Sequence, residues 1–216
     1  MKSSSEVGVL LLALTVLLSL YHPTHSFTYN PIRLPTDDDA GTAVLDADGD
    51  PLKPGTLYKI TAPGYGDVIL GHAFPVGLQE RGSLPGCPTE VLLVSNPEDN
   101  VRSVKFIPED ATATSILEST RLAVRFDSPV CVDFSNWHIS AGYDPSFVTT
   151  TQPSFSYNFM IHKSAKDNHY QLAFCPSDST MCYTVGTLCT QTGCPLGIAH
   201  LAISYLPISV QFLKGN

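Results

Sequence analysis

The fold is decided by the stretch Val44-Leu45-Asp46-Ala47-Asp48-Gly49-Asp50-Pro51-Leu52, which Tyr58-Lys59-Ile60 follows after a short spacer. An acidic turn separates two short apolar runs, and Gly49 is free to take a positive φ within that turn. We therefore expect a strand, a tight turn and a second strand. The side chain of Tyr58 is expected to pack inward.

Many short apolar runs, separated by turn residues such as Asp-Gly, Pro-Gly and Asn-Pro, make up the chain beyond Ala43. Two runs alternate, Leu122-x-Val124-x-Phe126 and Ile208-x-Val210-x-Phe212, which is the period of half-buried strands. About a dozen short strands and no convincing helical period predict an all-β fold, a sandwich or a barrel type. The clearest strands are expected at 57–61, 68–72, 90–95, 121–126, 156–162, 170–174, 198–204 and 208–213.

Composition excludes several classes of function. The 216 residues are 43% hydrophobic and 15% charged, which suits one domain with a core and not a disordered chain. The formal net charge of −8 argues against a nucleic-acid partner, because phosphate binding needs clustered Lys and Arg. No nucleophile elbow, metalloprotease motif or phosphate loop occurs, and the histidines are scattered. We therefore expect no enzyme, no cofactor and no metal site. The histidines beyond the leader are interpreted as surface or core filler: His72, His138, His162, His169 and His200.

The first 26 residues are expected to be a signal peptide. Lys2 precedes an apolar run over 7–20, which is shorter than the roughly 20 residues that a membrane-spanning helix needs. Cleavage is expected after Ser26, and a membrane anchor is the alternative. No later segment is long and apolar enough to span, so no membrane partner is expected. All six cysteines follow the leader, and an even count in the oxidising secretory route favours three disulfides.

Further landmarks follow the opening stretch in order. Their positions are Cys87-Pro88, Arg125-Phe126-Asp127-Ser128 before Cys131, and Leu172-Ala173-Phe174-Cys175-Pro176 before Cys182-Tyr183-Thr184-Val185-Gly186. Over residues 43–214 the pattern resembles the plant Kunitz-type, soybean trypsin inhibitor-like family of protease inhibitors. The resemblance implies a β-trefoil domain over 43–216, built from six hairpins, of which three form a barrel and three a cap.

The resemblance also implies a disulfide framework. Its first bridge would join Cys87 to Cys131, and its second would join Cys175 to Cys182. The remaining Cys189 and Cys194 can pair across a tight hairpin. A nested alternative, with Cys175–Cys194 and Cys182–Cys189, stays open because spacing does not determine connectivity.

Residues 27–42 are expected to form an extended, solvated arm, since they combine two prolines, an Asp run and a glycine. Within the arm lies one six-residue motif, Asn30, Pro31, Ile32, Arg33, Leu34 and Pro35. It resembles the vacuolar sorting propeptide of storage proteins of the sporamin type, to which the chain as a whole is also similar. That resemblance implies a plant vacuole and a second cleavage before about residue 43. A disordered terminus and an extracellular destination are the alternatives.

Family members block proteases with a convex loop that enters the active site as a substrate would. Counting back from Phe126 places the scissile bond at Thr112–Ala113, in a loop over 108–115. The residues expected to contact the protease are Asp110, Ala111, Thr112, Ala113 and Thr114. Between Phe106 and Thr120 there is no Arg or Lys, which a trypsin-like pocket requires. We therefore expect poor inhibition of trypsin, and at best a shallow elastase- or subtilisin-like pocket would accept Thr112.

Other interpretations of the sequence stay open at this point. Pro54 stands where relatives carry an Asn that braces the loop, so the brace must come from elsewhere or be missing. Arg81, in a Gly-containing segment, is a second candidate contact, and a solvated surface charge is the favoured alternative for it, because exposed charges are usually of that kind. Serine proteases are the expected partners of a monomer, with cysteine or aspartic proteases as further possibilities. The alternative function is vacuolar storage or defence with little or no inhibition.

Overall fold

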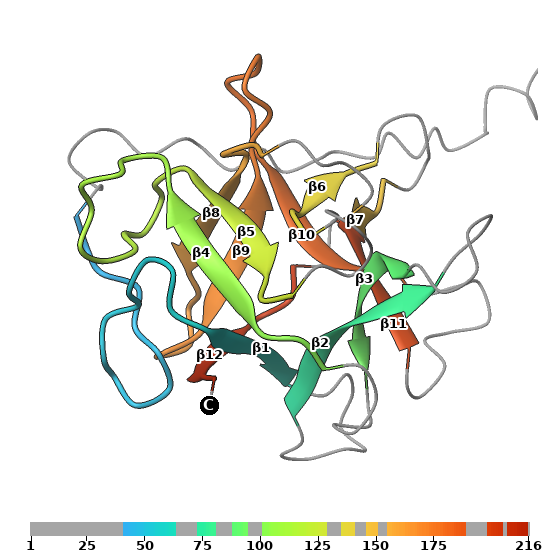
Figure 1. The fold of residues 1–216 in the computed structure, drawn as a ribbon, viewed down its shortest axis with the longest axis horizontal. Helices are drawn as coiled ribbons and strands as arrows, with labels where there is room; N and C mark the ends of the chain where they lie inside the picture. The colour runs from blue at the N-terminus through green and yellow to red at the C-terminus, as the bar shows by residue number, and fades with distance from the viewer. Residues whose placement is uncertain are drawn as a thin grey trace, which may run out of the picture.

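The computed structural model describes residues 41–63, 73–80, 88–94, 101–128, 135–140, 146–150, 155–188, 198–204 and 207–215. Within them the chain forms twelve β-strands and no helix, which confirms the all-β prediction (Figure 1). The described part contains no helix that could span a membrane. The predicted leader, the predicted sorting motif, His72, Arg81, Cys87, Cys131, Cys189 and Cys194 lie outside the described residues, as does the strand expected at 68–72. The strands are β1 Tyr58–Pro63, β2 Ala73–Glu80, β3 Pro88–Val94, β4 Val104–Pro108, β5 Leu122–Phe126, β6 His138–Ile139, β7 Val148–Thr149, β8 Phe159–Lys163, β9 Tyr170–Phe174, β10 Tyr183–Leu188, β11 Ile198–Ile203 and β12 Gln211–Lys214.

Six strands close into a barrel. Three antiparallel pairs, β12 with β1, β4 with β5, and β8 with β9, form its wall. Single pairings join these units, and backbone hydrogen bonds of 2.8 and 2.9 Å between Tyr170 and Val210 close the ring. The pairings that join the units are Tyr58↔Val104, Leu122↔Phe159 and Tyr170↔Val210. Closure leaves no free edge in this layer.

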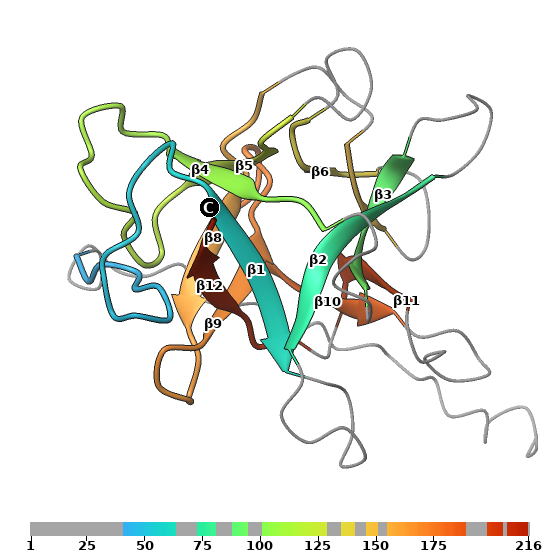
Figure 2. The ribbon, with the colours of Figure 1, turned by 60° about the horizontal axis from the view of Figure 1, so that its bottom comes forward.

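The other six strands form three hairpins that cap the barrel. They are β2 with β3, β6 with β7, and β10 with β11. Strand β3 pairs with both β7 and β11, so the three hairpins meet at one end of the barrel (to the right in Figure 1; Figure 2 shows the turned view). Every four consecutive strands therefore contribute two to the wall and two to the cap. This pseudo-threefold arrangement is the β-trefoil that the resemblance implied.

The core lies inside the barrel and follows the alternation read from the sequence. Leu122, Val124 and Phe126 on β5 are buried, whereas Arg125 is exposed. Tyr58 is only 1% exposed, as expected. Trp137 packs between Phe126 and Phe159, with ring centroids 5.5 and 6.2 Å away.

Some strands were not expected as strands. Strand β2 contains Pro75 and Gly77, which disfavour a strand locally, yet it pairs with β1 on one side and β3 on the other. Strands β6 and β7 have two residues each, too few to show a period. Long-range pairing therefore decides these elements.

The opening turn contains the expected glycine conformation, with φ of +87° at Gly49. Asp46, which is 1% exposed, accepts hydrogen bonds at Oδ1 from the amides of Asp48 and Asp50, at 3.0 and 2.9 Å. Its Oδ2 lies 3.8 Å from the ammonium of Lys214, which also contacts Asp50 at 3.0 Å. The turn thus joins the two ends of the domain, because Lys214 is the last residue of β12.

Substituting Asp46 with alanine is expected to lower the free energy of unfolding by about 2 kcal/mol, because two turn amides lose a charged acceptor. Asp48→Ala is the matched control, since this side chain is exposed in the same turn and should cost less than about 0.5 kcal/mol. Urea denaturation of both variants measures the difference. Equal losses would contradict the structural role assigned to Asp46.

Candidate functional site

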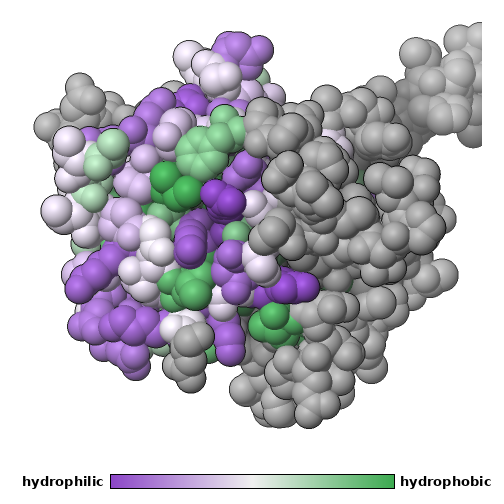
Figure 3. All heavy atoms as spheres, viewed as in Figure 1, coloured by the Kyte–Doolittle hydropathy of each residue, from purple (hydrophilic) through white to green (hydrophobic). Residues whose placement is uncertain are grey.

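The segment that joins β4 to β5, residues 109–121, forms a projecting loop (yellow-green, at the left of Figure 1). Glu109, Asp110, Ala111 and Thr112 are exposed, as is Thr114, and Ala113 is partly exposed. None of these residues belongs to a strand. Figure 3 shows this edge of the molecule as mostly pale or purple, so it is not a strongly apolar patch.

Both ends of the loop are firmly held by backbone hydrogen bonds. The amide of Glu109 donates to the carbonyl of Arg121 at 3.0 Å and thereby joins the two ends of the loop. The fully buried Ile116 donates to Leu52 at 2.8 Å and accepts from Val44 at 2.9 Å. The segment from the opening stretch therefore supports the loop from below, as the adjacent blue and yellow-green ribbons in Figure 2 show.

The tip of the loop is a β-turn over Asp110–Ala113. The amide of Ala113 donates to the carbonyl of Asp110 at 3.1 Å. The carboxylate of Asp110 accepts from the amide of Thr112 at 2.9 Å and from its hydroxyl at 2.6 Å. These hydrogen bonds to the charged form lower the pKa of Asp110, so the carboxylate is ionised at neutral pH.

The Asp110–Ala113 turn places the negative charge of Asp110 next to the side chain of Thr112. The backbone of this turn is not extended. Among the described residues, every hydrogen bond of segment 110–115 stays within the segment. The neighbourhood of Pro54 does not brace it, since the amides of Lys53 and Gly55 donate to Tyr58 Oη and to the carbonyl of Phe106. Asp110 is therefore the internal brace of the tip.

A second loop projects beside the first and shares an anchor with it. Cys175 and Cys182 form a disulfide, which is the pairing that the resemblance implied and which rules out the nested alternative. The loop that they close projects at the top of Figure 1, in orange. The guanidinium of Arg121 donates to the carbonyl of Cys175 at 2.9 Å, so the two loop bases are tied together.

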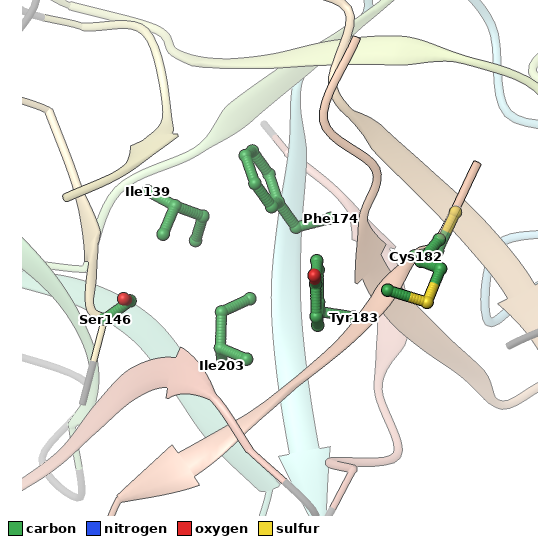
Figure 4. Close-up of a pocket in the computed structure, with 7 residues that line it drawn as sticks. Ile139, Ser146, Phe174, Cys182, Tyr183 and Ile203 are labelled. Atoms are coloured by element: carbon green, nitrogen blue, oxygen red, sulfur yellow. The ribbon is translucent and has the colours of Figure 1, made fainter. Parts of the chain in front are cut away.

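A cavity of about 370 Å³ lies beside the disulfide-closed loop, whose Cys182 lines it together with residues of the cap. Figure 4 shows its side chains converging from several strands, including Ile139 on β6, Phe174 on β9 and Ile203 on β11. Tyr183 is the one ionisable side chain among the described lining residues, so within that part no acid–base pair is present. The cavity is chiefly apolar.

A polar contact that the sequence did not predict lies at the C-terminal base of the loop. Ser119 Oγ lies 2.9 Å from His162 Nδ1 on β8, and the Ser119 amide donates to the carbonyl of Ile161 at 2.8 Å. Burial lowers the pKa of His162 and raises that of the neighbouring Glu118. No local signal could have found this contact, because 43 residues separate Ser119 from His162.

Comparison with known proteins gives consistent matches. The sequence profile of the Kunitz legume family, described as trypsin and protease inhibitor, matches residues 44–214. Sporamin B from Ipomoea batatas is 29% identical over 192 residues, which cover 81% of this chain and 86% of that protein. Aspartic protease inhibitor 4 from Solanum tuberosum is 32% identical over 177 residues, 77% of each chain.

A solved structure shows the same fold. Soybean trypsin inhibitor in complex with porcine pancreatic trypsin matches with a TM-score of 0.65 at 24% sequence identity. The match covers 81% of this chain and all of the inhibitor chain. The β-trefoil assignment is therefore supported both by strand pairing and by comparison.

Proposed function

Because the chain belongs to the Kunitz legume family of trypsin and protease inhibitors, we propose that it inhibits proteases through the 110–114 segment and inhibits trypsin poorly. In this proposal Thr112 enters the primary pocket of the protease, and Thr112–Ala113 is the bond that mimics the scissile one. Proteins of this family inhibit proteases and are not enzymes themselves.

The observation that carries the proposal is the exposed turn at the tip of a loop held at both ends. Fixed loop ends reduce the entropy lost when a protease binds. The same tip is poorly suited to trypsin, whose pocket carries a buried Asp and prefers Arg or Lys. Here the pocket would receive a neutral Thr112 with the ionised Asp110 hydrogen-bonded to it. A substrate binds in an extended conformation, so the Asp110–Ala113 turn must also open at a cost.

Titration against a panel of proteases tests the proposal. Bovine trypsin should show no stoichiometric inhibition in the nanomolar range, whereas elastase or subtilisin, whose pockets accept small side chains, should be inhibited more strongly. Papain and pepsin extend the panel to cysteine and aspartic proteases, the latter because a relative is named an aspartic protease inhibitor. Nanomolar inhibition of trypsin that Thr112→Ala abolishes would contradict the proposed specificity.

A second candidate function is vacuolar storage, which the sporamin-like motif at Asn30–Pro35 and the similarity to sporamin B favour. In this proposal residues 1–26 are removed as a signal peptide and residues 27–42 as a sorting propeptide, and the domain over 43–216 reaches the vacuole. N-terminal sequencing of the native protein tests both cleavages. High abundance in a storage organ without inhibition of any protease in the panel would favour storage alone.

A further inference from the structure

We propose that Ser119 and His162 form an acid-sensitive latch, which holds the C-terminal base of the 109–121 loop at neutral pH and releases it when His162 gains a proton. The latch itself follows from contacts in the fold. The latch goes beyond the proposed function and does not depend on it.

Ser119 is the hinge of the latch. Its φ of +61° lies in the left-handed region, which only Ser119 and Asn168 occupy among the described residues other than glycine. Such a backbone persists when its surroundings hold it in place. Two consecutive residues of β8 do so here, the Ile161 carbonyl through the backbone amide and the His162 ring through the hydroxyl. Loss of the hydroxyl contact therefore frees a strained residue.

The His162 ring is poorly placed to carry a charge. Its Nδ1 is taken by the Ser119 hydroxyl, and its Nε2 is shielded from solvent with no hydrogen-bond partner among the described residues. A protonated ring has two N–H donors, so protonation would bury a charged and unpaired donor. The Ser119 hydroxyl could also accept from a protonated Nδ1, so the cost of protonation falls on the shielded Nε2, and the latched state favours the neutral ring.

The ionisable groups around the latch come from three elements. Glu118 belongs to the loop itself, and Lys163 follows His162 on β8. Tyr170 lies on β9, and its hydroxyl accepts a hydrogen bond from the Leu45 amide. Residues 42–45, which pair with the loop base, carry no charge. None of these groups gives the buried Nε2 an acceptor in the described structure.

The two titrating groups act in opposite directions. Burial lowers the pKa of His162 from 6.5, so the latched state loses stability as the pH falls through about 6.5 and below. Burial raises the pKa of Glu118 from 4.5, so its ionised form destabilises the latched state as the pH rises above about 4.5. Protonation of Glu118 at low pH would instead stabilise the latched state. Release of the latch on acidification is therefore assigned to His162.

Hydrogen exchange of the intact folded protein tests the latch. After correction for intrinsic rates, peptides covering 109–121 should exchange up to about tenfold faster at pH near 5 than near 7, because protonation of the shielded His162 ring disfavours the latched state. His162→Gln, whose amide can still bond Ser119, should abolish this increase. His138→Gln is the matched control, because burial also lowers the pKa of His138 but this residue lies on β6 and bonds Thr149. It should retain the increase.

A second variant keeps the test decisive if His162→Gln does not fold. Ser119→Gly tolerates the positive φ but removes the hydroxyl, so the loop should exchange quickly at both pH values, with a ratio near one. Equal exchange rates of the wild-type loop at the two pH values would overturn the latch. Faster exchange near pH 5 that persists in both His162→Gln and Ser119→Gly would overturn it as well. Inhibition measured at pH 7 is independent of this outcome, so failure of the latch and failure of the proposed function are distinguishable.

Discussion

Thr112→Arg is expected to raise the affinity for bovine trypsin by about 100-fold. Close charge pairs across a protein interface have coupling energies of roughly 1.5–7 kcal/mol, and an arginine at this position would meet the buried Asp of the trypsin pocket. The substitution also removes the 2.6 Å hydrogen bond from the Thr112 hydroxyl to Asp110, which weakens the turn that must open. Inhibition constants of wild type and variant, measured at one pH, give the ratio.

The matched control is Thr114→Arg, which adds the same charge to another exposed position of the same loop. Because position 114 does not enter the primary pocket, its effect should remain below about threefold and depend on salt concentration. If the two variants bind trypsin equally well, the assignment of Thr112–Ala113 to the scissile position is wrong.

Phe106→Ala is expected to lower the free energy of unfolding by about 4 kcal/mol, within the usual range for a large aromatic residue removed from a core. Phe106 is fully buried on β4, and its ring contacts those of Phe212 and Tyr58, with centroids 5.2 and 6.1 Å away. The cavity would open where three barrel strands converge, since these rings come from β4, β12 and β1. Urea denaturation monitored by fluorescence measures the loss.

Leu213→Ala is the control for this prediction. Leu213 lies next to Phe212 on β12, but it is 39% exposed and should cost less than about 1 kcal/mol. A loss below 1 kcal/mol for Phe106→Ala would mean that the barrel interior repacks, and would contradict the assignment of this ring to the core.

The location of the candidate loop followed from the order of landmarks, but its conformation did not. Phe126 and the neighbouring residues place segment 110–114 by resemblance, and the structure shows that this segment is exposed and outside the sheets. The Asp110–Ala113 turn depends on which of several local hydrogen bonds Asp110 makes, and Asp side chains favour several turn types. The resemblance therefore indicated where an exposed loop lies but not its shape, and the inhibitory role of segment 110–114 stays a prediction.

The local sequence pattern alone determined three features that depend only on residues close together in the chain. They are the β-rich secondary structure, the turn at Gly49, and the inward-facing side chains of Leu122, Val124 and Phe126. Alternation reports which side chains avoid water, and that preference is the same wherever the strand pairs. Tertiary structure decided the rest, including strand β2 in spite of its Pro75 and Gly77, the contact of Asp46 with Lys214, and the contact of Ser119 with His162. The last two contacts join residues far apart in the chain, and only barrel closure brings their polar atoms within a few ångströms of one another.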